Sequence, residues 1–328
     1  MRPWKAAPSV RSVTTATPDG LEAGARTLKS RALAVTLIPG AGGKIRSFYD
    51  RVREREWLWA HPTLALDSPR IDDSYIACFD TGGIDECFPG VTPGEMPGHP
   101  GLRIPDHGEW WSLPWETRLV SDSEAEMVAR GVRFPVEIRR NVKLLEGSAV
   151  LRLSYTLLSH GTVPLPTVYC IHPLFAIEPG MRLEIDPGFS PTVSGGEPPA
   201  GIRPGDAFEW PTLGPLDLSR LDARAGSAVK VWGEAPPAGR VVLSHPGSRS
   251  RLVVRWDPAE LPHLGLWINQ GGWAGVPGAA PYANLGIEPG WGGVDGLDEA
   301  VERTKTARWL EPGDLHRWTI EVAIEEAP

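Results

Sequence analysis

The feature that most constrains the fold is a two-residue alternation of apolar and polar side chains that recurs along the chain. In residues 151–157, Leu and Tyr alternate with Arg, Ser and Thr, and residues 318–324 repeat the pattern. Residues 136–144 keep the same parity, interrupted only by Arg140. Such a period indicates strands with one buried and one wet face, which is typical of antiparallel sheet.

Frequent turn signals divide the remaining sequence into short segments. The chain holds 37 Gly and 34 Pro, which disfavours long helices. Further short strands are predicted at residues 32–38, 183–185, 229–232, 240–243, 252–256 and 264–269. The predicted fold class is therefore all-β, a large antiparallel β-sandwich with few short helices.

The texture of strands and turns is uniform from end to end, and no linker or internal repeat interrupts it. We therefore expect one domain over residues 1–328, with residues 1–30 as a peripheral N-terminal segment. The best helical candidate is residues 295–307, which begin with acidic and end with basic side chains. Residues 81–115 and 194–217 do not resemble strands and are predicted to be loops.

Charge and composition exclude several classes of protein. The formal net charge is -8, which argues against a nucleic-acid partner. No run of 18 apolar residues predicts a membrane span, and the N-terminus has no apolar signal region, so a cytoplasmic location is expected. Cys78, Cys87 and Cys170 lack paired spacing and are predicted to be buried free thiols, with no disulfide and no zinc site.

Polar residues are densest in the loop of residues 81–115. It contains Asp85, Glu86, His107 and Glu109, with Trp110 directly after the last of them. A long loop within a compact fold is often functional, although an ordinary exposed loop anchored by Trp explains the same residues. The chain also has 14 Trp, which either fill the core or line a cleft for a ligand with an apolar face, such as a sugar.

Two further candidates are single residues in apolar surroundings. His172 lies inside an apolar stretch, where a buried structural histidine is the alternative explanation. Glu288 lies between Ile287 and Pro289, and burial without a partner would raise its pKa and make it a better base near neutral pH. The alternative is a glutamate at a strand end in water.

Five segments, in this order, resemble segments of the aldose 1-epimerase (galactose mutarotase-like) superfamily, and the nearest branch is the hexose-6-phosphate mutarotases. They are GGIDECFPG (82–90), IPDHGEWWSLPW (104–115), SYTLLSHGTVPLPTVYCIHPLF (154–175), NLGIEP (284–289) and LEPGDLHRW (310–318). The resemblance implies the galactose mutarotase-like supersandwich. It also implies an enzyme that interconverts sugar anomers without a metal or organic cofactor.

Carried over to this sequence, the resemblance implies His172 as general acid, Glu288 as general base and His107 as a residue that orients the sugar. The acid protonates the ring oxygen while the base takes the proton from the C1 hydroxyl, so both must act near neutral pH. We expect the three side chains to line one pocket, with His172 and Glu288 on opposite sides of a pyranose-sized space. Trp110, Trp267 or Trp273 would lie against the sugar.

The sequence departs from the phosphosugar branch at three places. Thr81 stands where the branch has a phosphate-binding Arg, the Arg expected after His107 is missing, and no Asp matches near residues 229–232. The two missing arginines and the acidic loop favour an unphosphorylated sugar or derivative, with Asp85, Glu86 and Glu109 binding its hydroxyls. The missing Asp, which is usual in the whole family, bears instead on how sugar hydroxyls are recognised and motivates the binding-protein alternative below.

Two other functions remain open. One is a catalytically silent carbohydrate-binding protein of the same fold. The other is a metal-dependent sugar enzyme that uses Asp85, His107, Glu109 and His172 as ligands, because mixed His and carboxylate sets suit Zn²⁺ or Mn²⁺. Neither the identity of the sugar nor the oligomeric state follows from the sequence.

Overall fold

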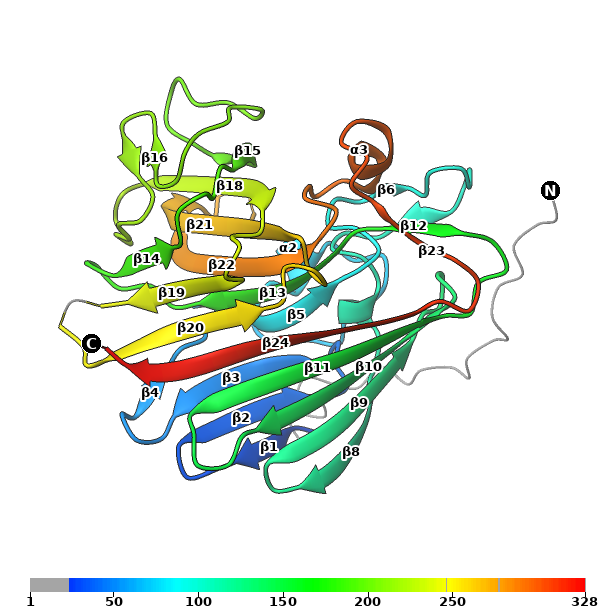
Figure 1. Cartoon of the computed structure of the whole chain (residues 1–328), viewed down its shortest axis with the longest axis horizontal. Coiled ribbons are helices and arrows are strands. Elements are labelled where there is room, and N and C mark those ends of the chain that lie inside the picture. The colour runs from blue at the N-terminus through cyan, green and yellow to red at the C-terminus, as the bar shows by residue number, and fades with distance from the viewer. Residues whose placement is uncertain (1–23, 246, 277, 328) are drawn as a thin grey trace.

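The computed structural model describes residues 24–245, 247–276 and 278–327. In these ranges the chain forms two large antiparallel sheets that pack face to face, as Figure 1 shows. The ten-stranded sheet has the order β1 (Arg26–Lys29), β2 (Leu33–Ile38), β3 (Lys44–Asp50), β5 (Gly83–Cys87), β13 (Tyr169–Phe175), β22 (Tyr282–Trp291), β21 (His263–Trp273), β18 (Ser227–Glu234) and β15 (Thr192–Glu197), with β4 (Arg55–Glu56) beside β3.

The second large sheet shows the predicted alternation most clearly. Its eight strands are, in order, β14 (Arg182–Ile185), β19 (Arg240–Ser244), β20 (Ser250–Trp256), β24 (Leu315–Glu326), β11 (Val150–Ser159), β10 (Val136–Leu144), β9 (Glu124–Arg130) and β8 (Glu116–Ser121). In β11 the apolar positions are buried while their neighbours are more exposed. This face packs against the ten-stranded sheet and forms the main hydrophobic core. The predicted fold class is confirmed.

Arg140, the residue that interrupts the apolar parity of β10, is also buried between the sheets. Its guanidinium donates to Glu86 Oε1 at 2.9 Å, and Glu86 comes from β5 of the opposite sheet. The hydroxyls of Tyr155 and Tyr169 donate to the same carboxylate at 2.7 and 2.9 Å. The buried charges are therefore paired and hydrogen-bonded, as a low-dielectric interior requires.

The remaining elements are short. Three two-stranded pairs are β6 (Gly94–Glu95) with β7 (Arg103–Ile104), β12 (Leu165–Thr167) with β23 (Arg308–Leu310), and β16 (Thr212–Leu213) with β17 (Leu216–Asp217). The helical elements are α2 (Tyr75–Cys78), the 3₁₀ turn η1 (Trp110–Ser112) and α3 (Leu297–Glu302), which is shorter than the predicted residues 295–307. No helix in the described ranges is long and apolar enough to cross a membrane.

The prediction that residues 81–115 and 194–217 form loops is wrong in part. Residues 83–87 form β5, a strand that is buried at every position, and β15 begins just before residue 194. A strand buried on both faces lacks the alternation by which a strand is recognised. The two acidic residues within β5 further hid it.

The structure bears on part of the cysteine prediction and on part of the prediction for the N-terminal segment. Cys87 and Cys170 are buried free thiols, but Cys78, at the end of α2, is exposed, so the prediction of a buried thiol is wrong there. Residues 1–23 of the predicted N-terminal segment lie outside the described residues. Within the rest of that segment, β1 forms one edge of the ten-stranded sheet.

Candidate functional site

A row of side chains crosses the middle of the ten-stranded sheet. Asp85 pairs with His172 between β5 and β13, and the register of β13 against β22 brings His172 opposite Glu288. Glu288 in turn pairs with Gly265, and Gly265 with Trp232. Because paired residues of an antiparallel sheet point to the same face, segments about 200 residues apart in sequence present their polar groups together.

Two glycines leave the space that this row needs. A Cβ on Gly265 would lie 2.8 Å from the Trp232 ring, and a Cβ on Gly286 would lie 2.6 Å from Glu288 Oε1. The Trp232 indole therefore lies over Gly265, and the Glu288 carboxylate lies over Gly286, where a side chain would collide with them. Glycine in a central strand often marks such a close approach.

Beside this row lies a cavity of about 350 Å³, within the usual size range of small-molecule sites. Strands of the sheet supply part of its wall and the loops above supply the rest. Its lining residues are Tyr75, Ile76, Asp80, Val91, Thr92, Pro93, Asp106, His107, His172, Leu174, Gly195, Gly196, Lys230, Trp267, Trp273 and Asp295. His107, His172, Trp267 and Trp273 thus lie where the sequence analysis expected them, at one cavity.

His107 is held in place by its neighbours. Its Nδ1 lies 2.8 Å from Asp106 Oδ1, and its ring stacks on Tyr75 with a centroid distance of 4.2 Å. Its backbone is left-handed, with φ of 58°, and so is that of Gly108, with φ of 74°. At Gly108 any side chain would overlap the carbonyl oxygen of Phe88. This turn brings the His107 ring to 5.4 Å from the His172 ring, centroid to centroid.

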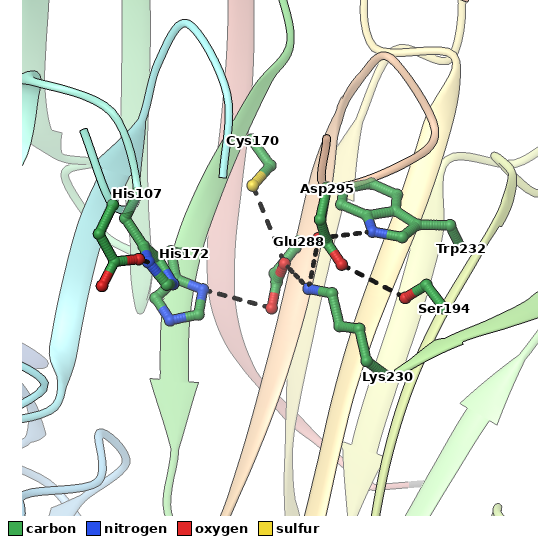
Figure 2. Close-up of polar contacts among 9 residues, drawn as sticks. His107, Cys170, His172, Ser194, Lys230, Trp232, Glu288 and Asp295 are labelled. Carbon is green, nitrogen blue, oxygen red and sulfur yellow. Dashed lines mark hydrogen bonds and ion pairs between the residues drawn. The ribbon is translucent and has the colours of Figure 1, made fainter. Parts of the chain in front are cut away.

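Glu288 lies immediately behind the cavity wall and has no exposed surface. Its Oε1 is 3.3 Å from His172 Nδ1, and its Oε2 accepts a hydrogen bond from Lys230 Nζ. The Cys170 thiol lies 3.8 Å from the same Oε2. Figure 2 shows the carboxylate between the imidazole on one side and the ammonium on the other.

Two expectations about Glu288 are therefore wrong. Burial alone would raise its pKa, but the positive charge of Lys230 and the contact with His172 outweigh burial and lower the pKa to about 2. The carboxylate also lies in direct contact with His172, whereas the sequence analysis expected a pyranose-sized space between them. The partner that reverses the pKa, Lys230, is 58 residues away in sequence and was not foreseen.

Lys230 belongs to a group of residues that the sequence analysis missed. It lies on β18, where the family pattern led us to look for an Asp. Its ammonium is 3.8 Å from Asp295 Oδ1, and Asp295 is held by Trp232 Nε1 at 2.9 Å and by the Ser194 hydroxyl at 3.3 Å (Figure 2). The carboxylates of Glu288 and Asp295 raise the pKa of Lys230 against the opposing effect of burial, so it stays protonated.

Asp80 is a second residue of the cavity that was missed. Its Oδ2 accepts from the Tyr282 hydroxyl at 3.0 Å, while its buried Oδ1 has no hydrogen-bond partner among the described residues. Burial raises the pKa of this carboxyl, although His172 and Tyr282 oppose the shift. A buried carboxylate oxygen without a donor is expensive unless water or a ligand supplies one.

Asp85 and Glu86 point to opposite faces of β5, as the two-residue period of a strand requires. Asp85 is bound by Lys44 Nζ and by the Tyr75 hydroxyl at 2.7 Å, and Glu86 points into the core between the sheets. Both are buried and neither lines the cavity. Their placement does not support the expectation that they bind sugar hydroxyls.

Glu109 and Trp110 are also interior residues. Glu109 accepts hydrogen bonds from the backbone amides of residues 132–134, at 2.9 to 3.3 Å, and so braces that turn. Trp110 stacks on Phe88 with a centroid distance of 4.1 Å inside the core. Neither residue lines the cavity, so a contact with sugar is not supported for either.

The ligand set of the metal-enzyme alternative is not assembled. Asp85 is paired with Lys44, and the carboxylate of Glu109 accepts hydrogen bonds from backbone amides. Across the part of the chain that the structure describes, no group of three or more His, Cys, Asp or Glu side chains is arranged to hold a metal ion.

Comparison with known proteins identifies the fold. No family model matches the chain, and no curated protein matches it. Among solved structures, a Synechocystis protein has 18% identity and a TM-score of 0.67, covering 98% of this chain and 100% of that one. A candidate aldose 1-epimerase from Escherichia coli K12 has 15% identity and a TM-score of 0.66, covering 92% and 99%.

A galactose mutarotase-like protein from Lactobacillus casei has 16% identity and a TM-score of 0.61, covering 92% of this chain and 100% of that one. The chain therefore has the galactose mutarotase-like fold over most of its length. At such identities the likeness establishes the fold alone and does not distinguish a phosphosugar branch.

Proposed function

We propose that this protein interconverts the anomers of an unphosphorylated sugar by acid/base opening and closing of the hemiacetal ring. The observation that carries the proposal is the contact between His172 and Glu288 at the wall of a cavity that also contains His107. The fold supports it, because several proteins of this architecture are described as mutarotase-like or as candidate aldose 1-epimerases.

The contact between the two side chains suits the chemistry of a hemiacetal. The ring oxygen and the anomeric hydroxyl are bonded to the same carbon, so an acid and a base that act on them must also be close together. His172 Nδ1 lies 3.3 Å from Glu288 Oε1 and His172 lines the cavity, so we assign its other ring nitrogen, Nε2, to the substrate. His172 then exchanges its proton with the ring oxygen, and Glu288 exchanges one with the anomeric hydroxyl.

The chemical character of the cavity lining favours a sugar that carries no phosphate. Trp267 and Trp273 offer apolar surface, with ring centroids 5.3 Å apart, against which the apolar face of a sugar could lie. Three acidic side chains, from Asp80, Asp106 and Asp295, are part of the lining, against one lysine, Lys230, whose charge is balanced by the buried Glu288 carboxylate. A phosphate group would therefore enter a site of mainly like charge.

The test is anomer exchange measured by NMR saturation transfer on a panel of hexoses, pentoses and glucose 6-phosphate. The wild type is expected to accelerate exchange of at least one unphosphorylated sugar and to leave glucose 6-phosphate at its uncatalysed rate. His172→Ala and Glu288→Gln should each lower the rate about 100-fold or more. The exposed residues His160→Ala and Glu146→Gln serve as matched controls. Equal rates in all five proteins would refute the proposal.

One observation favours a second candidate, a carbohydrate-binding protein without catalysis. Glu288 has no exposed surface and is covered by Lys230, so a base that meets substrate is not evident in the unliganded cavity. Titrating the same sugars while following Trp fluorescence separates the two candidates. Saturable quenching without any acceleration of anomer exchange would favour the binding protein.

A further inference from the structure

We propose that Lys230 is a catalytic residue whose ammonium contacts the oxygen on the reacting carbon and stabilises the negative charge that develops there. This inference rests on the proposed function and adds to it a cation in the reacting site. Figure 2 shows the side chain reaching from its own strand towards the two carboxylates of Glu288 and Asp295.

The first support is the position of the ammonium. Lys230 lines the cavity, pairs across the sheet with Trp267, and is only 8% exposed. An ammonium has three hydrogens to donate, and among the described residues Lys230 Nζ makes one hydrogen bond, to Glu288 Oε2. The nearest other carboxylate, that of Asp295, is 3.8 Å away. Donor capacity therefore remains for a ligand in the cavity.

The second support is the route to Glu288. The carboxylate is fully buried, and its two oxygens face His172 and Lys230, both of which line the cavity. We therefore place the hydroxyl that reacts with Glu288 between these two groups. It would therefore meet the ammonium and the carboxylate together.

The third support is energetic. With a pKa near 2, Glu288 is a weak base for an unassisted hydroxyl. The cation that weakens the base also lowers the pKa of a hydroxyl bound beside it, because it stabilises the resulting oxyanion. The ease of proton transfer depends on the difference between the pKa of the bound hydroxyl and the pKa of Glu288. Because Lys230 lowers both values, that difference does not grow.

The step balances without any further reagent. Glu288 takes the proton of the anomeric hydroxyl, and an electron pair on that oxygen forms the carbonyl as the bond from C1 to the ring oxygen breaks. The ring oxygen keeps the bond pair and takes a proton from His172. After rotation about the bond between C1 and C2, the reverse steps close the other anomer. Lys230 keeps its own proton throughout.

Other titratable groups around Glu288 enter the pH dependence. From β13 it is faced by His172 and the Cys170 thiol, and from the loop after β22 Asp295 lies beyond Lys230. The thiol of Cys87 lies behind that of Cys170 on β5. Lys230 supplies the positive charge that lowers the pKa of Glu288 most.

The first experiment compares Lys230→Met and Lys230→Arg with the wild type, using the sugar that the wild type turns over fastest. Lys230→Met should lower kcat about 100- to 1,000-fold with little change in KM, since the lost contact belongs to the transition state. Lys230→Arg should retain much of kcat because it keeps the charge. Lys143→Met, which removes a partly exposed lysine paired with Glu124, is the matched control.

The pH profile gives a second readout. Without the ammonium, burial raises the pKa of Glu288, so the acidic limb of kcat/KM should move to higher pH in Lys230→Met. The Glu288 carboxyl signal in protein labelled with ¹³C-glutamate, assigned with Glu288→Gln, reports the same change without turnover. A wild-type kcat in Lys230→Met would overturn the proposal.

A double-variant cycle separates contact with substrate from an effect through Glu288. In a Glu288→Gln background, Lys230→Met should lower the residual rate further if the ammonium touches the reacting oxygen. An unchanged residual rate would reduce Lys230 to a positioning residue and overturn the inference. The double variant removes the buried ammonium and the buried Glu288 carboxylate together, and Asp295 keeps its hydrogen bonds from Trp232 and Ser194, which protects its folding. If the wild type accelerates no sugar, the proposed function itself fails, a result distinct from either of these.

Discussion

Replacing Glu109 by Gln separates its two possible roles, a sugar ligand and an internal brace. The carboxylate accepts three backbone hydrogen bonds, from Val132, Arg133 and Phe134, at 3.1, 2.9 and 3.3 Å. These hydrogen bonds lower the pKa of Glu109, but the effect of burial is larger and raises the pKa from 4.5 to about 7. The protein therefore holds a carboxyl that ionises more readily in the unfolded chain than in the folded one.

The sign and size of the effect on stability follow from these two values. A pKa raised on folding contributes stability that is fully present below pH 4.5 and is lost as the pH rises through about 7. At about 1.4 kcal/mol for each pH unit between the two values, the loss is about 3 kcal/mol. Most of it should fall between pH 5 and pH 8.

Urea unfolding at pH 5 and pH 8 measures this contribution. On going to pH 8, the wild type should lose about 2 to 3 kcal/mol relative to Glu109→Gln, because the amide does not titrate. Glu146→Gln, at an exposed position, should follow the wild type. A difference between wild type and Glu109→Gln that is the same at both pH values would refute the reasoning. Anomer exchange in Glu109→Gln should stay near the wild-type rate.

Two further substitutions test the fold around the site. Arg140→Met strands a buried carboxylate and should lower the free energy of unfolding by about 3 to 5 kcal/mol in urea, whereas Arg139→Met, at a mostly exposed position, should change it by under about 1. Gly108→Ala should abolish anomer exchange and lower the melting temperature, because its Cβ would overlap the carbonyl of Phe88. Gly98→Ala, with a similar φ of 78° but open space around it, should lower the melting temperature less and leave exchange intact.

The fold was predictable where a strand has one wet face. The alternation in β10, β11 and β24 marks these strands in the sequence because water lies on one side of them. In β5 both faces are covered, so the period disappears, and its acidic pair looks like part of a loop. That Glu86 belongs to the core becomes visible only when the strands that cover both faces of β5 are placed in three dimensions.

For the candidate site, the sequence supplied the histidines but not their electrostatics. His107, His172 and Glu288 were named from the resemblance, and in the structure the two histidines line one cavity while Glu288 lies directly behind its wall, 3.3 Å from His172. The pKa of Glu288 depends on Lys230, whose place beside it is decided by the pairing of β18 with β21 and of β21 with β22. Pairing between distant strands leaves no local pattern in a sequence, so such a partner is invisible there.

The placement of His172 and Glu288 on neighbouring strands in the middle of the large sheet bears on how this site can evolve. Inserting one residue into β13 or β22 would turn the side chain of His172 or Glu288 to the opposite face, since the side-chain period is two. Asp106 and Asp295 lie on loops, where changes of length leave the strand register intact. Diversification of the ligand can thus proceed in the loops while His172 and Glu288 stay fixed.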